Sequence, residues 1–564
     1  MPGSSVARLA SAQPPRTDVA ERHRAEAAQP FGRTPWDWAA WLLLVVLAVL
    51  AAFTITDYGV SNDEEVQHRY GELIVALYTS GFSDQNLFAY RNLYLYGGLF
   101  DIIAVLAGEV LPFDIYLIRH ALSVAFGIAG IGAAWATARL VAGPRAGLLA
   151  AVLLAVTAQW YGPMFNHTKD IPFAATMIGA TYFLLRAARD LPAPRWRDMI
   201  GFGVLLGAAC GLRAMGLLLF GYAGLVVLAH LLPQVTQDRA AAFASARRAA
   251  ARFLPAFLLG YAIMLAAWPW AALDIFNPLR AVFAFSHFHY EIHTLFAGHV
   301  YTMANVPRWY VPAYLAIRLP LVLWAGALLS AAFALRSGML AALNEPSATR
   351  MRREIGWLWF FVLFPLACQV AARGPAFTGL RHFMFLLPLL AVLAGVGFNA
   401  LFDLIATRRP RIVMPAAIAL CAALLWEASL LVRLHPYQYL YYNALVGGLK
   451  GAADRYEMDY WGNMMPEAVR ALERYAKRVD PAGESRLVGV CGERFSFEHE
   501  AADQFQWSVG WYEADFFIAP THMDCDSANN GNPVIRIERL GVLIGVVKDR
   551  RGFPWPTGPA QASK

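Results

Sequence analysis

Long apolar runs alternate with short polar segments over the first three quarters of the chain. Most of these runs hold about 17–25 residues, the length that an α-helix needs to cross the hydrocarbon core of a bilayer. The pattern therefore predicts a mainly α, polytopic membrane protein with about eleven transmembrane helices. The predicted spans are 36–56, 117–140, 146–163, 171–188, 199–212, 214–232, 252–272, 312–335, 356–372, 382–404 and 412–431.

Composition agrees with a membrane location. Of the 564 residues, 58% are hydrophobic and only 15% are charged, whereas soluble globular proteins carry about a quarter charged residues. An ordinary soluble enzyme is therefore excluded. The net charge of +7 does not indicate nucleic acid as a partner, because the chain has no dense Lys/Arg face with interleaved aromatic residues.

The distribution of basic residues predicts the orientation. With a cytoplasmic N-terminus, the predicted inner loops hold 17 Lys and Arg in 65 positions, and the outer loops hold 8 in 116. Short cytoplasmic loops retain positive charge, so this bias supports that orientation. The apolar segment 93–111 would reverse the bias if it crossed the membrane, so we expect a re-entrant or interfacial helix there. The C-terminus is then outside the cytoplasm.

Three regions are expected. Residues 1–35 are rich in Ala, Arg, Pro and Ser without an apolar period, and predict a disordered cytoplasmic tail. Residues 36–432 form the transmembrane region. Short β-type runs and a helical stretch in 433–564 predict a small extracytoplasmic α/β domain. It contains Cys491 and Cys525, and the sequence leaves open whether they form a disulfide.

The first outer loop carries three adjacent carboxylates, Asp63, Glu64 and Glu65, at the expected start of an amphipathic helix. Asp63 or Glu64 fits a general base on an acceptor, or a metal ligand. Helix capping by Asn62 and Asp63 accounts for the same residues equally well.

The second outer loop places His167, Lys169 and Asp170 between two apolar runs. Polar residues at a membrane edge have an energetic cost that function would explain. Two structural interpretations remain open: Lys169 pairs with Asp170, or Asp170 caps a helix that has Pro172 in its first turn.

Two arginines stand at outer helix junctions, Arg213 and Arg381. A guanidinium is planar and permanently charged, which suits it to bind phosphate. The alternative is that both side chains extend to lipid headgroups.

A histidine-rich loop lies within 273–311. Its polar residues alternate, which would put them on one face of a strand, but their spacing matches no standard zinc motif. A divalent metal ion is therefore only a candidate cofactor, and a loop that orders over substrate is the favoured interpretation. No nucleotide cofactor is expected, because no phosphate-binding loop motif is present. The candidate ligands are His287, His289, Glu291 and His293.

The order of these motifs resembles the GT-C membrane glycosyltransferases. The resemblance rests on three features: Asp63-Glu64 followed by Tyr70, an interfacial segment, and a second outer loop ending in Asp170-Ile-Pro-Phe173. The chain is most similar to the branch that contains protein O-mannosyltransferases and bacterial aminoarabinose transferases of lipid A. The similarity covers roughly 36–432, which implies a GT-C-like catalytic domain.

The resemblance implies transfer of a hexose or pentose from a polyprenyl-phosphate donor. The acceptor would be a lipid, glycan or protein on the outer side of the bacterial inner membrane, with the C-terminal domain in the periplasm. By position, the expected catalytic residues are Asp63, Glu64 and Asp170; the expected donor-phosphate ligands are Arg213, Arg381 and Lys169; and the expected acceptor or loop residues are His167, His287, His289, Glu291 and His293.

An aromatic tail at 435–462 resembles that of uncharacterised bacterial members. Its rings fit either stacking on a sugar or packing of the C-terminal domain onto the membrane surface. The competing functional class is a transporter or flippase of lipid-linked glycans. A transporter is typically built from paired repeats, and none is evident here. A structural scaffold would leave the charged outer loops unexplained.

Overall fold

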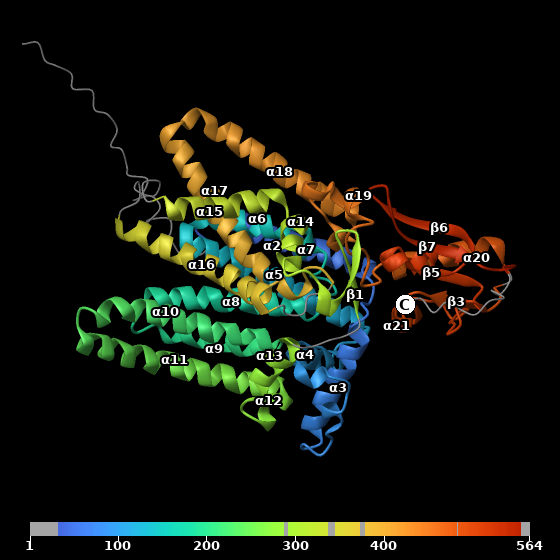
Figure 1. The fold of residues 1–564 in the computed structure, drawn as a ribbon, viewed down its shortest axis with the longest axis horizontal. Helices are drawn as coiled ribbons and strands as arrows, with labels where there is room; N and C mark the ends of the chain where they lie inside the picture. The colour runs from blue at the N-terminus through green and yellow to red at the C-terminus, as the bar shows by residue number, and fades with distance from the viewer. Residues whose placement is uncertain (1–31, 287–291, 337–344, 373–377, 482, 554–564) are drawn as a thin grey trace, which may run out of the picture.

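The computed structural model describes residues 32–286, 292–336, 345–372, 378–481 and 483–553. The predicted disordered tail, 1–35, lies outside the described residues except for its last four positions. The described chain is mainly helical, and a small sheet lies near the C-terminus. Figure 1 shows the long helices side by side, with the sheet beyond one end of the bundle.

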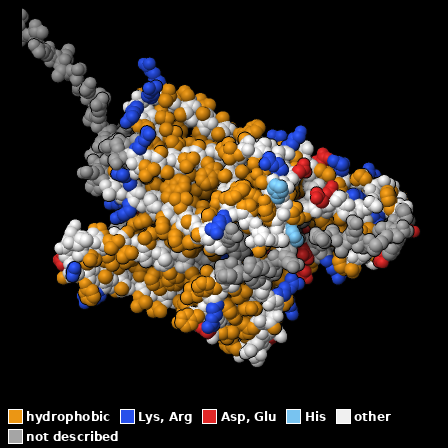
Figure 2. Space-filling model, viewed as in Figure 1, with side chains coloured by type: hydrophobic (Ala, Val, Ile, Leu, Met, Phe, Trp, Pro, Cys, Tyr) orange, Lys and Arg blue, Asp and Glu red, His pale blue; other side chains and the backbone are white. Residues whose placement is uncertain are grey.

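Eight of the described helices are long and apolar enough to cross a membrane, which supports a multi-pass membrane protein. Large apolar side chains on them are exposed, among them Phe53, Leu425 and Val432. Figure 2 shows hydrophobic side chains covering the helices, as expected of a surface that faces lipid. The helices are α2 (Pro35–Thr54), α5 (Ile115–Ala142), α8 (Asp170–Arg189), α10 (Leu218–Val235), α11 (Arg239–Ala267), α16 (Glu345–Ala372), α17 (Leu386–Arg408) and α18 (Val413–Leu434).

Three predicted spans take other forms, so the expected number of eleven is not confirmed. The predicted span 146–163 contains α6 (Pro144–Ala155), and the predicted span 199–212 corresponds to α9 (Trp196–Cys210). At 1.5 Å per residue these helices measure about 18 and 22 Å, which is short of the roughly 30 Å of a hydrocarbon core.

The third exception is a break inside the predicted span 312–335. Helices α14 (Tyr310–Arg318) and α15 (Leu321–Leu335) meet at an angle of 111°. Leu319 between them has an extended backbone, because a residue that precedes a proline avoids the helical conformation and Pro320 lacks an N–H. Hydropathy alone does not reveal such a break, because the residues on both sides of it are apolar.

The segment before α5 contains two short helices. The amphipathic α3 (Glu64–Thr79) follows the first span and buries Tyr70 and Ile74. Helix α4 (Leu99–Gly108) has ten residues, about 15 Å of rise, and is too short to cross the bilayer. This agrees with the prediction of a non-crossing helix in 93–111.

The C-terminal region has the predicted α/β character. Helix α20 (Met465–Val479) packs on a five-stranded sheet of order β4-β3-β5-β7-β6. Strand β3 runs parallel to β4 and β5, whereas β7 runs antiparallel to β5 and β6. The strands are β3 (Arg486–Val490), β4 (Phe505–Trp507), β5 (Phe516–Pro520), β6 (Asn532–Arg539) and β7 (Val542–Asp549).

Cys491 and Cys525 form a disulfide between the end of β3 and the segment after β5, with Cα atoms 6.1 Å apart. This resolves the alternative that the sequence left open. The bond joins residues separated by 34 positions, so it restricts the unfolded chain considerably.

Replacing both cysteines with serine should lower the free energy of unfolding of the sheet by about 2–4 kcal/mol. Hydrogen exchange of the full-length protein, measured at amides of β5 and β7, checks this value. The matched control is Cys421→Ser, because Cys421 is a free, exposed cysteine on α18. Equal exchange protection in the double variant and the wild type would contradict the stabilising role.

The tail tyrosines pack inside the protein and do not offer their faces to a sugar. Tyr439 and Tyr442 are 1% and 3% exposed. The Arg318 guanidinium lies 4.3 Å from the centroid of the Tyr442 ring, and it donates to the carbonyl oxygens of Tyr439 (2.6 Å) and Glu457 (2.7 Å). The sugar-stacking interpretation of these two rings was wrong, because the Tyr442 ring covers the buried Arg318 at the end of α14 and the Tyr439 ring packs against the rings of Tyr460 and His167.

Candidate functional site

Four charged residues from separate parts of the chain meet at helix ends. Asp63 precedes α3, and Asp170 is the first residue of α8. Arg213 lies between α9 and the short 3-10 helix η4 (Ala214–Leu217), and Arg381 begins the 3-10 helix η7 (Arg381–Phe383). The sequence predicted all four, and the structure brings them together.

The four side chains alternate in sign and form what we call the ion-pair chain, Asp63–Arg381–Asp170–Arg213. The Nε of Arg381 donates to Oδ2 of Asp170 at 3.0 Å. The Nη2 of Arg381 donates to Asp63, and the Nη2 of Arg213 donates to Asp170. Each arginine therefore lies against at least one carboxylate, and Arg381 joins both.

These contacts contradict the capping interpretation of Asp63 and Asp170 and the lipid-headgroup interpretation of the two arginines. Asp63 occupies the N-cap position of α3 but makes no capping hydrogen bond with its side chain, and Asp170 is bonded to the two arginines. The arginines do not extend to lipid headgroups, since their side chains are only 9% and 12% exposed for Arg213 and Arg381.

Exposure differs sharply along the ion-pair chain. The Asp63 side chain is 41% exposed and that of Asp170 only 3%. Burial lowers the pKa of Arg381, but the carboxylates of Asp63 and Asp170 outweigh burial and raise it above its usual value. The site therefore offers an accessible carboxylate, suited to accept a proton, next to a permanent cation, suited to bind an anion.

A close approach of two backbone segments positions Arg213. A Cβ atom on Gly97 would lie 2.0 Å from the carbonyl oxygen of Gly211. Only glycine fits at Gly97, and Leu99 N donates to that same carbonyl oxygen at 3.1 Å. The start of α4 is thereby fixed against the end of α9, two residues before Arg213.

His167 and Lys169 each lie near a carboxylate: His167 near Asp170 of the ion-pair chain, and Lys169 near Asp101. The Nδ1 of His167 is 4.0 Å from Oδ2 of Asp170, and burial lowers the pKa of His167 to about 3. The Nζ of Lys169 is 4.0 Å from Oδ2 of Asp101 and 4.8 Å from the centroid of the Tyr96 ring. Burial lowers its pKa to about 8. Lys169 thus contacts Asp101, and the expected pair with Asp170 does not form.

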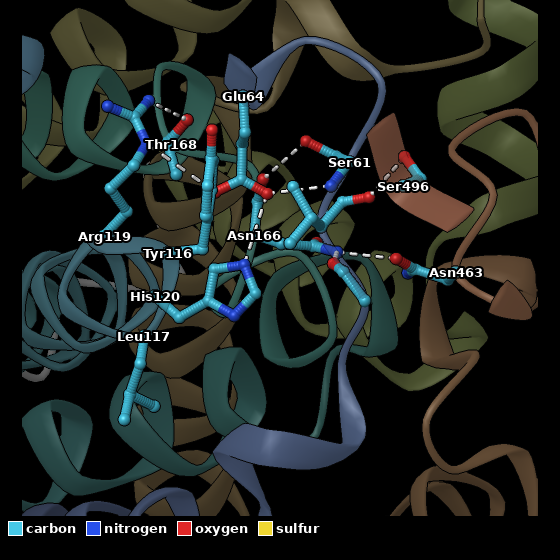
Figure 3. A network of polar contacts seen from close by, with 12 residues as sticks. Ser61, Glu64, Tyr116, Leu117, Arg119, His120, Asn166, Thr168, Asn463 and Ser496 are labelled. Atoms are coloured by element: carbon cyan, nitrogen blue, oxygen red, sulfur yellow. Dashed lines mark hydrogen bonds and ion pairs between the residues drawn. The ribbon is translucent and has the colours of Figure 1, made fainter. Parts of the chain in front are cut away.

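Glu64 does not accompany Asp63 but turns into a buried polar network (Figure 3). Its Oε2 accepts from Ser61 N at 2.8 Å and lies 3.2 Å from Nε2 of His120. The Nε of Arg119 lies 3.8 Å from the other carboxylate oxygen, and its Nη2 donates to Asp101 at 2.9 Å. Glu64 is fully buried, and its contacts with Ser61 and His120 support the loop that carries Asp63.

Glu64→Ala should lower the free energy of unfolding by about 1–3 kcal/mol, because it leaves the buried N–H of Ser61 and Nε2 of His120 without their hydrogen-bond partner. Thermal unfolding of the purified protein measures the loss as a lower Tm. Glu65→Ala is the matched control, since Glu65 is the exposed neighbour on the same helical turn. Equal Tm values for the two variants would contradict the supporting role.

The C-terminal tail enters the site, which sequence reasoning missed. The guanidinium of Arg381 lies 4.2 Å from the centroid of the Trp461 ring. Asn463 Oδ1 accepts from Asn166 at 2.6 Å, and Asn62 donates to the Tyr460 carbonyl oxygen at 3.3 Å. The aromatic run around Trp461 was visible in the sequence, but no local signal connects it with loops that lie hundreds of residues earlier.

The histidine-rich loop falls largely outside the described residues. This applies to His287, His289 and Glu291. His293 lies exposed at the start of a hairpin of β1 (His293–Phe296) and β2 (His299–Thr302). Within the described ranges, no group of three or more His, Cys, Asp or Glu side chains is placed to hold a metal ion. A metal site at this loop stays a prediction.

Comparison with known proteins gives one family match. Residues 113–246 match the model described as dolichyl-phosphate-mannose-protein mannosyltransferase. No curated protein sequence matches the chain.

Several solved structures are similar overall. Apo ArnT from Cupriavidus metallidurans is 17% identical, with a TM-score of 0.45 over 89% of this chain and 97% of that one. The same protein bound to undecaprenyl phosphate is 16% identical, with a TM-score of 0.48 over 91% and 98%. The apo oligosaccharyltransferase from Archaeoglobus fulgidus is 13% identical, with a TM-score of 0.45 over 85% and 69%.

The family match confirms the predicted resemblance to GT-C membrane glycosyltransferases and supports a glycosyltransferase activity. The matched segment includes Asp170 and Arg213. It does not reach Asp63 or Arg381, which the structure adds to the same site through the ion-pair chain.

Proposed function

We propose that this chain, which resembles the GT-C membrane glycosyltransferases over residues 113–246, transfers a sugar from a polyprenyl-phosphate donor to a lipid, glycan or protein acceptor. The observation that carries the proposal is the ion-pair chain. It sets an exposed carboxylate beside an arginine that can hold a phosphate leaving group.

The donor sugar is bonded to a phosphate that must leave with a negative charge. In the proposed reaction, the acceptor oxygen or nitrogen loses its proton to Asp63 and bonds to the anomeric carbon. The bond from that carbon to the phosphate oxygen breaks, and polyprenyl phosphate leaves with the electron pair. Arg381 and Arg213 stabilise the developing charge through fixed N–H donors.

Donor binding would rearrange the ion-pair chain. A phosphate oxygen competes with the carboxylates for the N–H groups of Arg381. Asp63 is the accessible carboxylate of the two, so it gives way more easily than the buried Asp170. Release from Arg381 would free Asp63 to accept a proton from the acceptor.

We place the site on the outer side of a bacterial inner membrane, with the N-terminus in the cytoplasm. The charge bias of the loops supports this orientation. A disulfide between Cys491 and Cys525 suits an oxidising compartment such as the periplasm. In this arrangement 36–432 is the catalytic domain and 433–564 is a periplasmic domain whose Trp461 contacts Arg381.

The proposal is tested with purified full-length protein, radiolabelled polyprenyl-phosphate sugars and envelope extracts. A transferase moves the label from the lipid donor into a second compound. A flippase in proteoliposomes would carry the intact donor across the bilayer and leave its chemical form unchanged. Donor that crosses the bilayer without cleavage would overturn the proposal. A parallel incubation with EDTA tests the candidate divalent metal.

A further inference from the structure

The tail segment 460–463 forms one wall of the site. The proposed reaction assigns no role to its residues. Trp461 is 3% exposed, and its ring contacts two members of the site: the Arg381 guanidinium at 4.2 Å and the His167 ring at 5.2 Å, both to ring centroids. Asn62 and Asn166 hold the segment in place through Tyr460 and Asn463. These contacts hold Trp461 against Arg381.

Three nitrogen atoms at this wall, one on Trp461 and two on the neighbouring His167, are buried and have no hydrogen-bond partner among the described residues. They are Nε1 of Trp461 and both ring nitrogens of His167. Buried polar groups in folded proteins are nearly always paired, so orphaned groups at one place call for an explanation. These atoms lie beside the residues proposed to hold the donor phosphate, and a group of the donor itself would pair with them.

The hydrogen-bonding capacity of the three nitrogens indicates which chemical group of the donor would pair with them. An indole N–H only donates, whereas a neutral imidazole has one donor and one acceptor. His167 is neutral because burial, together with the nearby Arg381 and Arg213, lowers its pKa to about 3. Phosphate oxygens only accept and would leave the acceptor nitrogen of His167 unpaired. Hydroxyl groups both donate and accept.

We propose that Trp461 and His167 form a subsite for the hydroxyl groups of the donor sugar. The inference rests on the proposed function and deepens it. The indole N–H donates to one hydroxyl oxygen, and the imidazole pairs with a hydroxyl in both directions. Because the Trp461 ring lies against Arg381, the subsite adjoins the arginine that holds the phosphate to which the sugar is bonded. The sugar reaches these nitrogens when Asp63 separates from Arg381.

The test compares binding of undecaprenyl phosphate with binding of the same lipid carrying a sugar. Trp461→Phe keeps an aromatic ring against Arg381 but removes the N–H. We expect it to weaken binding of the best-bound donor among undecaprenyl-phosphate glucose, mannose and galactose about tenfold, as the loss of a buried hydrogen bond implies. Binding of undecaprenyl phosphate should change less than twofold. Trp426→Phe is the matched control, since Trp426 is 60% exposed on α18.

A second pair of variants keeps the test informative if Trp461→Phe does not fold. His167→Gln retains a donor and an acceptor and should keep the sugar preference, whereas His167→Leu should lose it. An equal loss for both lipids, or no loss for either, overturns the subsite. Wild-type protein that binds undecaprenyl phosphate without discriminating any sugar also overturns the subsite but leaves the proposed function standing. Wild-type protein that binds none of these lipids counts against the proposed function itself.

Discussion

Asp63→Asn should lower kcat for glycosyl transfer by a factor of about 10²–10⁴, the contribution typical of a general base. Asparagine has nearly the same size and still accepts a hydrogen bond from Arg381, so the site should keep its shape. It cannot take the acceptor proton at neutral pH. Donor binding should therefore survive while turnover is lost.

The measurement is steady-state transfer by the purified variant, with the donor KM determined beside kcat. Glu65→Gln is the control, because Glu65 is the exposed carboxylate two residues further on, in the first turn of α3, and should behave as wild type. A kcat for Asp63→Asn within twofold of the wild type would remove Asp63 from the mechanism.

The second large effect is expected at Arg381, the residue that joins both carboxylates. Arg381→Leu removes the cation that faces the leaving phosphate and leaves Asp63 beside Asp170 without a charge between them. We expect kcat/KM to fall by about 10²–10³, as for loss of one preorganised donor to a developing negative charge. Arg381→Lys should recover only part of this loss, because an ammonium cannot reproduce the planar fork of a guanidinium.

Initial rates over a range of donor concentrations separate the effects on KM and kcat. Arg69→Leu controls for the loss of an arginine near the site, since its side chain is 58% exposed and pairs only with Glu72 among the described residues. Arg213→Ala should raise the donor KM less than Arg381→Leu does, because Asp170 is the one carboxylate among the described residues that pairs with Arg213. A donor KM and kcat unchanged in Arg381→Leu would rule out the phosphate-binding role.

The charged members of the site were predictable because burying charge at a membrane edge is costly. Asp63, Asp170, Arg213 and Arg381 each interrupt or border an apolar run, and such residues seldom occur there without a reason. The structure joins these four into the ion-pair chain.

The neighbours of these residues were not predictable in the same way. Glu64 follows Asp63 and Lys169 precedes Asp170, but one residue of helix turns the chain by about 100°. Adjacent side chains at a helix start therefore point to different places. Glu64 meets His120, and Lys169 meets Asp101.

Long-range packing also could not be predicted from the sequence pattern. The bend at Pro320 and the short α6 and α9 are hidden in continuous apolar runs. The contact of Trp461 with Arg381 depends on how the tail folds back over the helix ends. Hydropathy gave the membrane character correctly because it depends only on local composition.

In the proposed reaction, the ion-pair chain cleaves a sugar from a polyprenyl phosphate with Asp63 as base. Phosphorus NMR of purified wild-type and Asp63→Asn protein, incubated with a polyprenyl-phosphate sugar and an envelope acceptor, follows this cleavage. We predict that wild-type protein converts the phosphodiester signal to that of polyprenyl phosphate, with one sugar appearing on the acceptor for each phosphate released, and that Asp63→Asn does not. A phosphodiester signal that persists with the wild type for every donor, or an equal rate of release by both proteins, would show that Asp63 does not act as the base of such a reaction.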